Sequence, residues 1–171
     1  MFHGGFGLLN FVGLPKPTFH AYRFLSKMGE YFISKGNNYL ATMDENAKLR
    51  MIIYNFPEEY TKAIPISPYP KRDLIDEIER IGNDKQFKIV IKSDKPIEKL
   101  RIEMIDKEHG NALYEWEKMG FKEYLSKEEV RTLREKLLQG KTYYVNIDKS
   151  QTLVLTLPRW AIVLIEEVRA L

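Results

Sequence analysis

The amino-acid sequence predicts a mainly β protein, an antiparallel β-sandwich preceded by an N-terminal loop and helix and accompanied by short helices. About seven segments have the two-residue alternation or the β-branched enrichment of strands. Turn-forming residues, rather than crossover helices, separate most of these segments. A chain of 171 residues with 44% hydrophobic and 12% aromatic residues has enough apolar side chain for one main core.

Residues 1–16 contain too many breakers for a helix or strand, so we expect a loop. The breakers are Gly4, Gly5, Gly7, Gly13 and Pro15, and the apolar residues that would anchor the loop are Phe2, Phe6 and Phe11. The Gly-Gly-Phe-Gly run lacks both the Gly-x-Gly-x-x-Gly spacing and the Lys-Ser/Thr of a Walker motif. The pattern therefore argues against nucleotide binding.

A helix is predicted over Pro17–Met28, because proline is favoured in a first turn and Gly29 provides a stop. Apolar side chains cover most of its circumference and leave a narrow polar stripe at His20, Arg23 and Lys27. We therefore expect the helix to be buried on most sides, with His20 on its polar side.

The next two strands, Tyr39–Met43 and Leu49–Phe56, read as a hairpin because turn formers separate them. Four prolines then predict an irregular connection over Pro57–Pro70. Leucine and isoleucine at helical spacing predict a surface helix over Arg72–Ile81.

The centre of the chain is a strand over Lys99–Asp106, which we expect to pair with a strand over Gln86–Lys92 across the Ser-Asp-Lys-Pro turn. A short helix over Ala112–Met119 follows, with Trp116 on its inner face and Gly120 as its C-terminal stop.

The last third of the chain begins with a capping box, Ser126-Lys-Glu-Glu, which predicts a helix over Lys127–Leu138. Three strands complete the chain. They are predicted over Tyr143–Ile147, Thr152–Leu157 and Ala161–Val168, separated by turn formers.

Charge and composition exclude several classes of function. The net charge of +3 comes from 27 basic and 24 acidic residues spread along the chain, which disfavours nucleic-acid binding. The chain has no cysteine, so thiol chemistry and cysteine-ligated zinc are excluded. No apolar run approaches the ~20 residues of a membrane helix, and no signal peptide is visible, so we expect a cytoplasmic protein without membrane contact.

The chemically capable residues favour structural roles. The three histidines, His3, His20 and His109, have no metal-ligand spacing, and we expect neither a metal nor a cofactor. His109 reads as a solvated turn residue. Trp116 and Trp160 could stack on sugars, but large aromatics beside a helix or strand are more often core anchors. Paired glutamates occur at a loop, a helix start and a strand end, where solvation explains them.

Two parts of the chain resemble glycoside hydrolase family 39, the family of β-xylosidases and α-L-iduronidases. The first part is the N-terminal sequence FHGGFGLLNFVGLPKP. The second comprises Ile105-Asp106, Asn111-Ala112, Trp116, Met119-Gly120 and Leu125, followed by a short acidic helix. The resemblance implies that residues 1–33 are the loop and helix after the eighth strand of a (β/α)8 barrel. Residues 34–171 would then be the accessory β-sandwich.

The same resemblance implies what the chain lacks. The acid/base and nucleophile glutamates of the family precede Met1 in family order, so we assign no catalytic residue here. His3 and Phe6, in a loop that would border the active-site face, are the candidate substrate contacts in an intact enzyme.

Two functions follow as hypotheses. The chain is either a C-terminal glycosidase fragment, inactive alone, or a stand-alone β-sandwich that binds carbohydrate or another protein. In the first case residues 1–33 would contact the missing barrel or a second copy of the chain. An exposed row of aromatics would favour binding, whereas aromatics buried in one core would favour the fragment.

Overall fold

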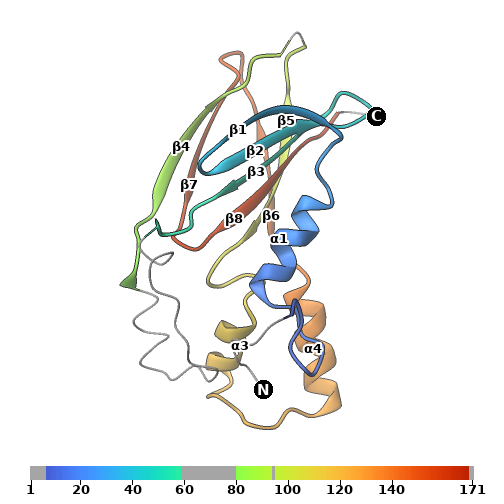
Figure 1. Ribbon diagram of the computed structural model, residues 1–171, viewed down its shortest axis with the longest axis vertical. Helices are drawn as coiled ribbons and strands as arrows, with labels where there is room; N and C mark the ends of the chain where they lie inside the picture. The colour runs from blue at the N-terminus through green and yellow to red at the C-terminus, as the bar shows by residue number, and fades with distance from the viewer. Residues whose placement is uncertain (1–6, 59–79, 94, 170–171) are drawn as a thin grey trace.

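The computed structural model describes residues 7–58, 80–93 and 95–169, and within them it is an antiparallel β-sandwich with helices outside the large sheet (Figure 1). Six strands form the large sheet in the order β1-β2-β3-β8-β5-β6, and β4 and β7 form a second, smaller sheet. Helix α1 lies against the large sheet, while α3 and α4 lie together below it (Figure 1). The predicted fold class is confirmed.

The elements have the following bounds. The large sheet contains β1 (Tyr31–Gly36), β2 (Tyr39–Met43), β3 (Leu49–Tyr54), β8 (Ile162–Glu167), β5 (Lys99–Ile105) and β6 (Lys141–Asn146). The small sheet contains β4 (Lys85–Val90) and β7 (Thr152–Leu157). The helices are α1 (Pro17–Leu25), α3 (Ala112–Lys118) and α4 (Lys127–Leu137).

The main core lies between the two sheets. Side chains alternate along each strand, so one set from each central strand, such as Leu100 and Ile102 of β5, points inward and is fully buried. Leu155 of β7 and the partly buried Phe87 of β4 pack against them from the small sheet. Each Å² of apolar surface removed from water in this way contributes roughly 25 cal/mol.

The opposite face of the large sheet is also apolar where α1 covers it. Phe24 of α1 is fully buried against Ile52, Ile105 and Leu164, which come from β3, β5 and β8. Beneath the helix these three central strands are therefore buried on both faces, although antiparallel strands commonly have one solvent-exposed face.

Several local predictions are confirmed. The capping box is complete, because the Ser126 side chain accepts from the Glu129 amide and the Glu129 side chain accepts from the Ser126 amide. Gly120 has a φ of +68° beyond the end of α3, the left-handed conformation that favours glycine. The predicted strands Tyr39–Met43 and Thr152–Leu157 have the same bounds as β2 and β7.

The predicted hairpin between the strands at 86–92 and 99–106 is wrong. β4 pairs with β7, while β5 pairs with β6 and β8. The described residues Ser93, Lys95 and Pro96 belong to the connection between β4 and β5, which lie in different sheets. Beyond them the buried Ile97 donates its amide to the Gln151 side chain at 2.8 Å.

β1 was not predicted, because its side chains are mostly exposed and show no clear alternation. Its pairing with β2 shifts register between Phe32 and Ser34. The division of the chain between residues 33 and 34 stays a prediction, although β1 contains residues from both sides of it. The predicted helix over Arg72–Ile81 and most of the Pro57–Pro70 connection lie outside the described residues.

Candidate functional site at the helix-covered face of the large sheet

Helix α1 is the element that positions the candidate site. Pro17 occupies its first turn, and the chain turns after Ser26, whose hydroxyl donates to the Arg23 carbonyl at 2.9 Å. Gly29 then passes so close to β2 that an added Cβ would lie 2.2 Å from the Met43 carbonyl oxygen. Its amide donates to the Thr42 hydroxyl at 2.8 Å, which fixes the end of the helix segment on the sheet.

A buried carboxylate joins α1 to the sheet. Glu103 of β5 is only 3% exposed, yet it faces the helix rather than water. It accepts from Arg23 at 2.6 Å, lies 3.5 Å from the Lys27 ammonium and accepts from Arg101 at 3.2 Å. Burial acts to raise the pKa of Glu103, but the hydrogen bond and charge of Arg23, with Lys27 and Arg101, hold that pKa at about 2. Glu103 is therefore ionised at any physiological pH.

His20 lies on the polar stripe of the helix, as expected, next to Arg23, but it is fully buried. Its ring accepts from Arg23 through Nδ1 at 3.2 Å and stacks edge-on against Phe19. Burial, followed by the charge of Arg23, lowers the pKa of His20 to about 4. The polar stripe of the helix thus faces the protein, because Glu103 lies beneath it and pairs with Arg23 and Lys27.

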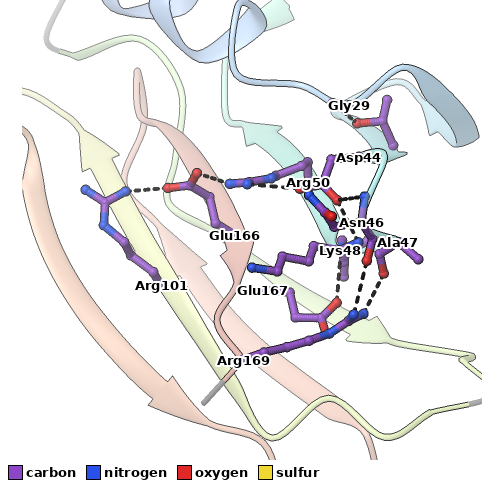
Figure 2. A network of polar contacts seen from close by, with 12 residues as sticks. Gly29, Asp44, Asn46, Ala47, Lys48, Arg50, Arg101, Glu166, Glu167 and Arg169 are labelled. Atoms are coloured by element: carbon purple, nitrogen blue, oxygen red, sulfur yellow. Dashed lines mark hydrogen bonds and ion pairs between the residues drawn. The ribbon is translucent and has the colours of Figure 1, made fainter. Parts of the chain in front are cut away.

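Charged side chains continue across the large sheet in a row, which Figure 2 shows in close-up. Arg50 of β3, Glu166 of β8 and Arg101 of β5 are direct cross-strand neighbours. Glu166 accepts hydrogen bonds from both arginines, and Arg50 also donates to Asp44 at 3.1 Å. A continuous polar chain therefore runs from His20 of α1 through Arg23, Glu103 and Arg101 to Asp44, which begins the turn between β2 and β3. Figure 2 shows the part of this chain from Arg101 to Asp44.

The other side of α1 is exposed and apolar. Tyr22 is 59% exposed and Leu25 is 50% exposed. Beside the helix lies a groove of about 360 Å³, whose lining includes Leu25, Leu40 and Ile162. Exposed apolar side chains that border an apolar groove are typical of a surface that another body covers.

The described part of the N-terminal loop packs on α4 and also exposes apolar side chains. Leu14 is fully buried against α4, while Leu9 and Phe11 are 47% and 69% exposed. Arg134 of α4 donates to the carbonyls of Val12 and Gly13 at 3.1 Å each, so the loop is held by hydrogen bonds as well as by packing.

A larger hollow of about 470 Å³ lies on the inner side of β2 and β3, next to β4. Its lining is mainly apolar and includes Met51, Phe87 and Ile89. Such a lining offers few polar partners for sugar hydroxyls, so we do not place a sugar there.

The residues that the sequence singled out do not gather in one place. His3 and Phe6 lie outside the described residues. Trp116 is half-buried against the α4 cluster, and its indole N–H donates to the Lys122 carbonyl at 2.8 Å. Trp160 is half-buried beside Phe56, with ring centroids 5.0 Å apart. His109 is half-buried in its turn, with Nδ1 2.8 Å from Asp106.

The carboxylates of the described ranges do not have the properties of a glycosidase pair. Glycoside hydrolysis needs one carboxylic acid with a raised pKa beside a second carboxylate. Every described carboxyl group with a resolved change has a lowered pKa, and each lies beside cationic partners or backbone amides. Within the same ranges, no cluster of three His, Asp or Glu side chains could hold a metal ion. No described helix is long and apolar enough to cross a membrane.

Comparison with known proteins identifies the family. The sequence profile described as "Glycosyl hydrolases family 39" matches residues 1–138. The chain belongs to glycosyl hydrolase family 39. Within this family the chain is 25% identical over 133 residues to a β-xylosidase of Geobacillus stearothermophilus, covering 78% of this chain and 23% of that protein. It is 28% identical over 138 residues to a β-xylosidase of Caldicellulosiruptor saccharolyticus, covering 77% and 24%. The chain thus spans about a quarter of the length of these relatives.

Solved structures show the same fold. A monomeric β-xylosidase from Caulobacter crescentus CB15 superposes with a TM-score of 0.70 and 22% identity, covering 98% of this chain and 34% of that chain. A family-39 enzyme from Xanthomonas axonopodis pv. citri gives a TM-score of 0.65 and 17% identity, covering 97% and 33%. The sandwich with its outer helix is therefore an architecture found within longer family-39 proteins.

Sequence reasoning missed Glu103 as the centre of the joint between helix and sheet in this family-39 chain. The strand pattern placed it on the face opposite Leu100 and Ile102, which is correct, but did not show that α1 covers that face. The available signal was the alternation itself: an apolar Ile105 follows Glu103 on the same face, so that face could not be wholly solvated.

Proposed function

We propose that this chain is the C-terminal part of a family-39 glycosidase of the β-xylosidase type, in which it forms the accessory sandwich and carries the last helix of the catalytic barrel. In this proposal the chain alone does not hydrolyse glycosides. Its function is to hold that helix in a fixed position against the sandwich.

The two-sided character of α1 is the observation that carries the proposal. One side is fixed to the sheet by Phe24 and by the buried Glu103 cluster. The other side exposes Tyr22 and Leu25 beside an apolar groove. A helix with an apolar face in water would be stabilised by a second body, and the relatives are about four times as long as the matched region. A barrel is the body that we propose.

The lowered pKa values of Asp44, Glu103, Glu115 and Glu129 support the proposed inactivity, because none of these four carboxyl groups is suited to donate a proton at neutral pH. An assay with an aryl β-xyloside should therefore give no turnover by the purified chain. Turnover that persists through purification and disappears when a glutamate of this chain is changed to glutamine would contradict the proposal.

Without a barrel, the exposed side of α1 should bind a second copy of the chain. We expect light scattering to show association, and we expect the paired change Tyr22→Ser and Leu25→Ser to reduce it. Tyr124→Ser is the matched control, because Tyr124 is 76% exposed but lies on the connection between α3 and α4. A monomeric full chain, or equal association of the α1 variant and the control, would contradict the assignment of this surface.

A further inference from the structure

The outer face of the large sheet has a second feature besides its contact with α1, namely a row of residues that crosses all six strands. The register places Phe32, Thr42, Arg50, Glu166, Arg101 and Tyr144 side by side in this order, from β1 to β6. At a spacing of about 4.8 Å between strands, the row is about 24 Å long. We call it the transverse row.

The two arginines of the transverse row are more exposed than Glu166, the carboxylate between them, and than Asp44, which pairs with Arg50 outside the row. The Glu166 and Asp44 side chains are 13% and 19% exposed, compared with 23% for Arg50 and 27% for Arg101. Both Nη atoms of Arg101 donate to carboxylates. Because a guanidinium carries five N–H groups, this half-exposed side chain has donors beyond those two bonds.

Further polar and cationic residues lie in the next row on the same face. Lys99 of β5 is exposed, and Lys48 next to β3 is half-buried. Asn146 of β6 is directly opposite Lys99 and is exposed. Glu103 belongs to the same cluster, because Arg101 shares it with Arg23 and Lys27 of α1. The cluster with the two lysines therefore holds six cations against three carboxylates, Asp44, Glu103 and Glu166.

Exposed aromatic rings stand at both ends of the transverse row. Phe32 is 64% exposed and Tyr144 is 57% exposed. The Lys99 ammonium lies 4.9 Å from the centroid of the Tyr144 ring, so a cation and an aromatic ring are presented together. Exposed rings at the two ends of a row about 24 Å long, with partly exposed arginines between them, suit a long polymer better than a compact ligand.

We propose that this face binds a polysaccharide that carries carboxylate groups, such as a uronate-substituted xylan. Guanidinium groups recognise carboxylates with paired hydrogen bonds, and the terminal aromatic rings supply surfaces against which sugar rings pack. The choice of a polysaccharide rests on the proposed function as part of a carbohydrate-degrading enzyme. The choice of an anionic one rests on the charge of the face.

A nucleic acid fits the same face less well. Proteins that bind nucleic-acid backbones commonly neutralise about six to ten phosphates. The excess here is three cations, and the carboxylates are interleaved with the arginines rather than segregated from them. The observations therefore favour a sparsely charged polymer.

Affinity electrophoresis of the full 171-residue chain in gels that contain glucuronoxylan, neutral arabinoxylan or no polysaccharide tests the proposal. We expect retardation by glucuronoxylan only, decreasing with added salt. Tyr144→Ala and Lys99→Gln should each weaken binding by about three- to tenfold, since each removes one exposed stacking or charge contact. Neither side chain takes part in the arginine-carboxylate bonds, so both variants should fold.

Tyr124→Ala and Lys127→Gln are the matched controls, because both residues are exposed and lie near or in α4, away from the large sheet. They should bind as the unaltered chain does, and circular dichroism should show all five proteins folded. Equal retardation by neutral arabinoxylan, tighter binding to single-stranded DNA, or no binding by the folded chain would each overturn the proposal. None of these outcomes bears on the association of α1 with a barrel, which Tyr22 and Leu25 test separately.

Discussion

Replacing Glu103 by glutamine tests whether the buried charge cluster fixes α1 on the sheet. The substitution preserves the shape of the side chain and removes its charge, leaving Arg23, Lys27 and Arg101 without their shared carboxylate. The ordinary carboxyl pKa of 4.5 and the value of about 2 in the folded chain differ by an amount worth roughly 3 kcal/mol, at about 1.4 kcal/mol per pH unit. Because the three cations are 22–37% exposed, solvent screens part of this attraction, and we expect a loss of about 2 kcal/mol.

The pH dependence of this loss has a definite direction. Since folding lowers the pKa of Glu103, its stabilisation is fully present above about pH 4.5, where the unfolded carboxyl is also ionised. It disappears as the pH falls towards 2. The difference in unfolding free energy between the unaltered chain and Glu103→Gln should therefore be largest at neutral pH and shrink below pH 4.5.

Urea denaturation followed by circular dichroism at several pH values measures this difference. Glu123→Gln is the matched control, because Glu123 is an exposed carboxylate on the connection between α3 and α4. A Glu103→Gln variant as stable as the control at neutral pH, or a loss that does not change with pH, would refute the reasoning.

Three further predictions concern the stability of other positions in the fold. The free energy of unfolding of the unaltered chain should fall by up to roughly 3 kcal/mol as the pH drops from 6.5 to 4. The reason is that His20 binds a proton in this range when the chain is unfolded, whereas the folded ring, with a pKa of about 4, does not. Urea denaturation of His20→Gln should not show this decrease of stability with pH. Gly29→Ala should cost about 3 kcal/mol in thermal denaturation, since its Cβ would meet the Met43 carbonyl, whereas Gly120→Ala, with open space around it, should cost only about 1–2 kcal/mol for its positive φ. Trp116→Ala should cost about 2 kcal/mol, less than a fully buried tryptophan, and an unchanged melting temperature would show that its packing contributes nothing.

Sequence patterns alone located those elements that are stabilised by residues close to one another along the chain. The Ser126 and Glu129 pair specifies the start of α4 because both hydrogen bonds lie within one turn. Gly120 specifies the end of α3 because left-handed backbone favours glycine at that position. Alternation likewise located β2, β5 and β7 and separated the inward side chains of β5 from the outward ones. The sequence motifs at both ends of the match also indicated the family.

Tertiary structure alone decided which strands pair and which polar side chains are buried. Every strand offers the same backbone donors and acceptors, so the turn-like residues between β4 and β5 could not reveal that β4 pairs with β7 instead. Glu103 and Arg23 are 80 residues apart, and neither has a local signal of burial. A charge can be buried only where an opposite charge from another element meets it, so the burial of Glu103 depends on where α1 lies and not on its own sequence neighbours.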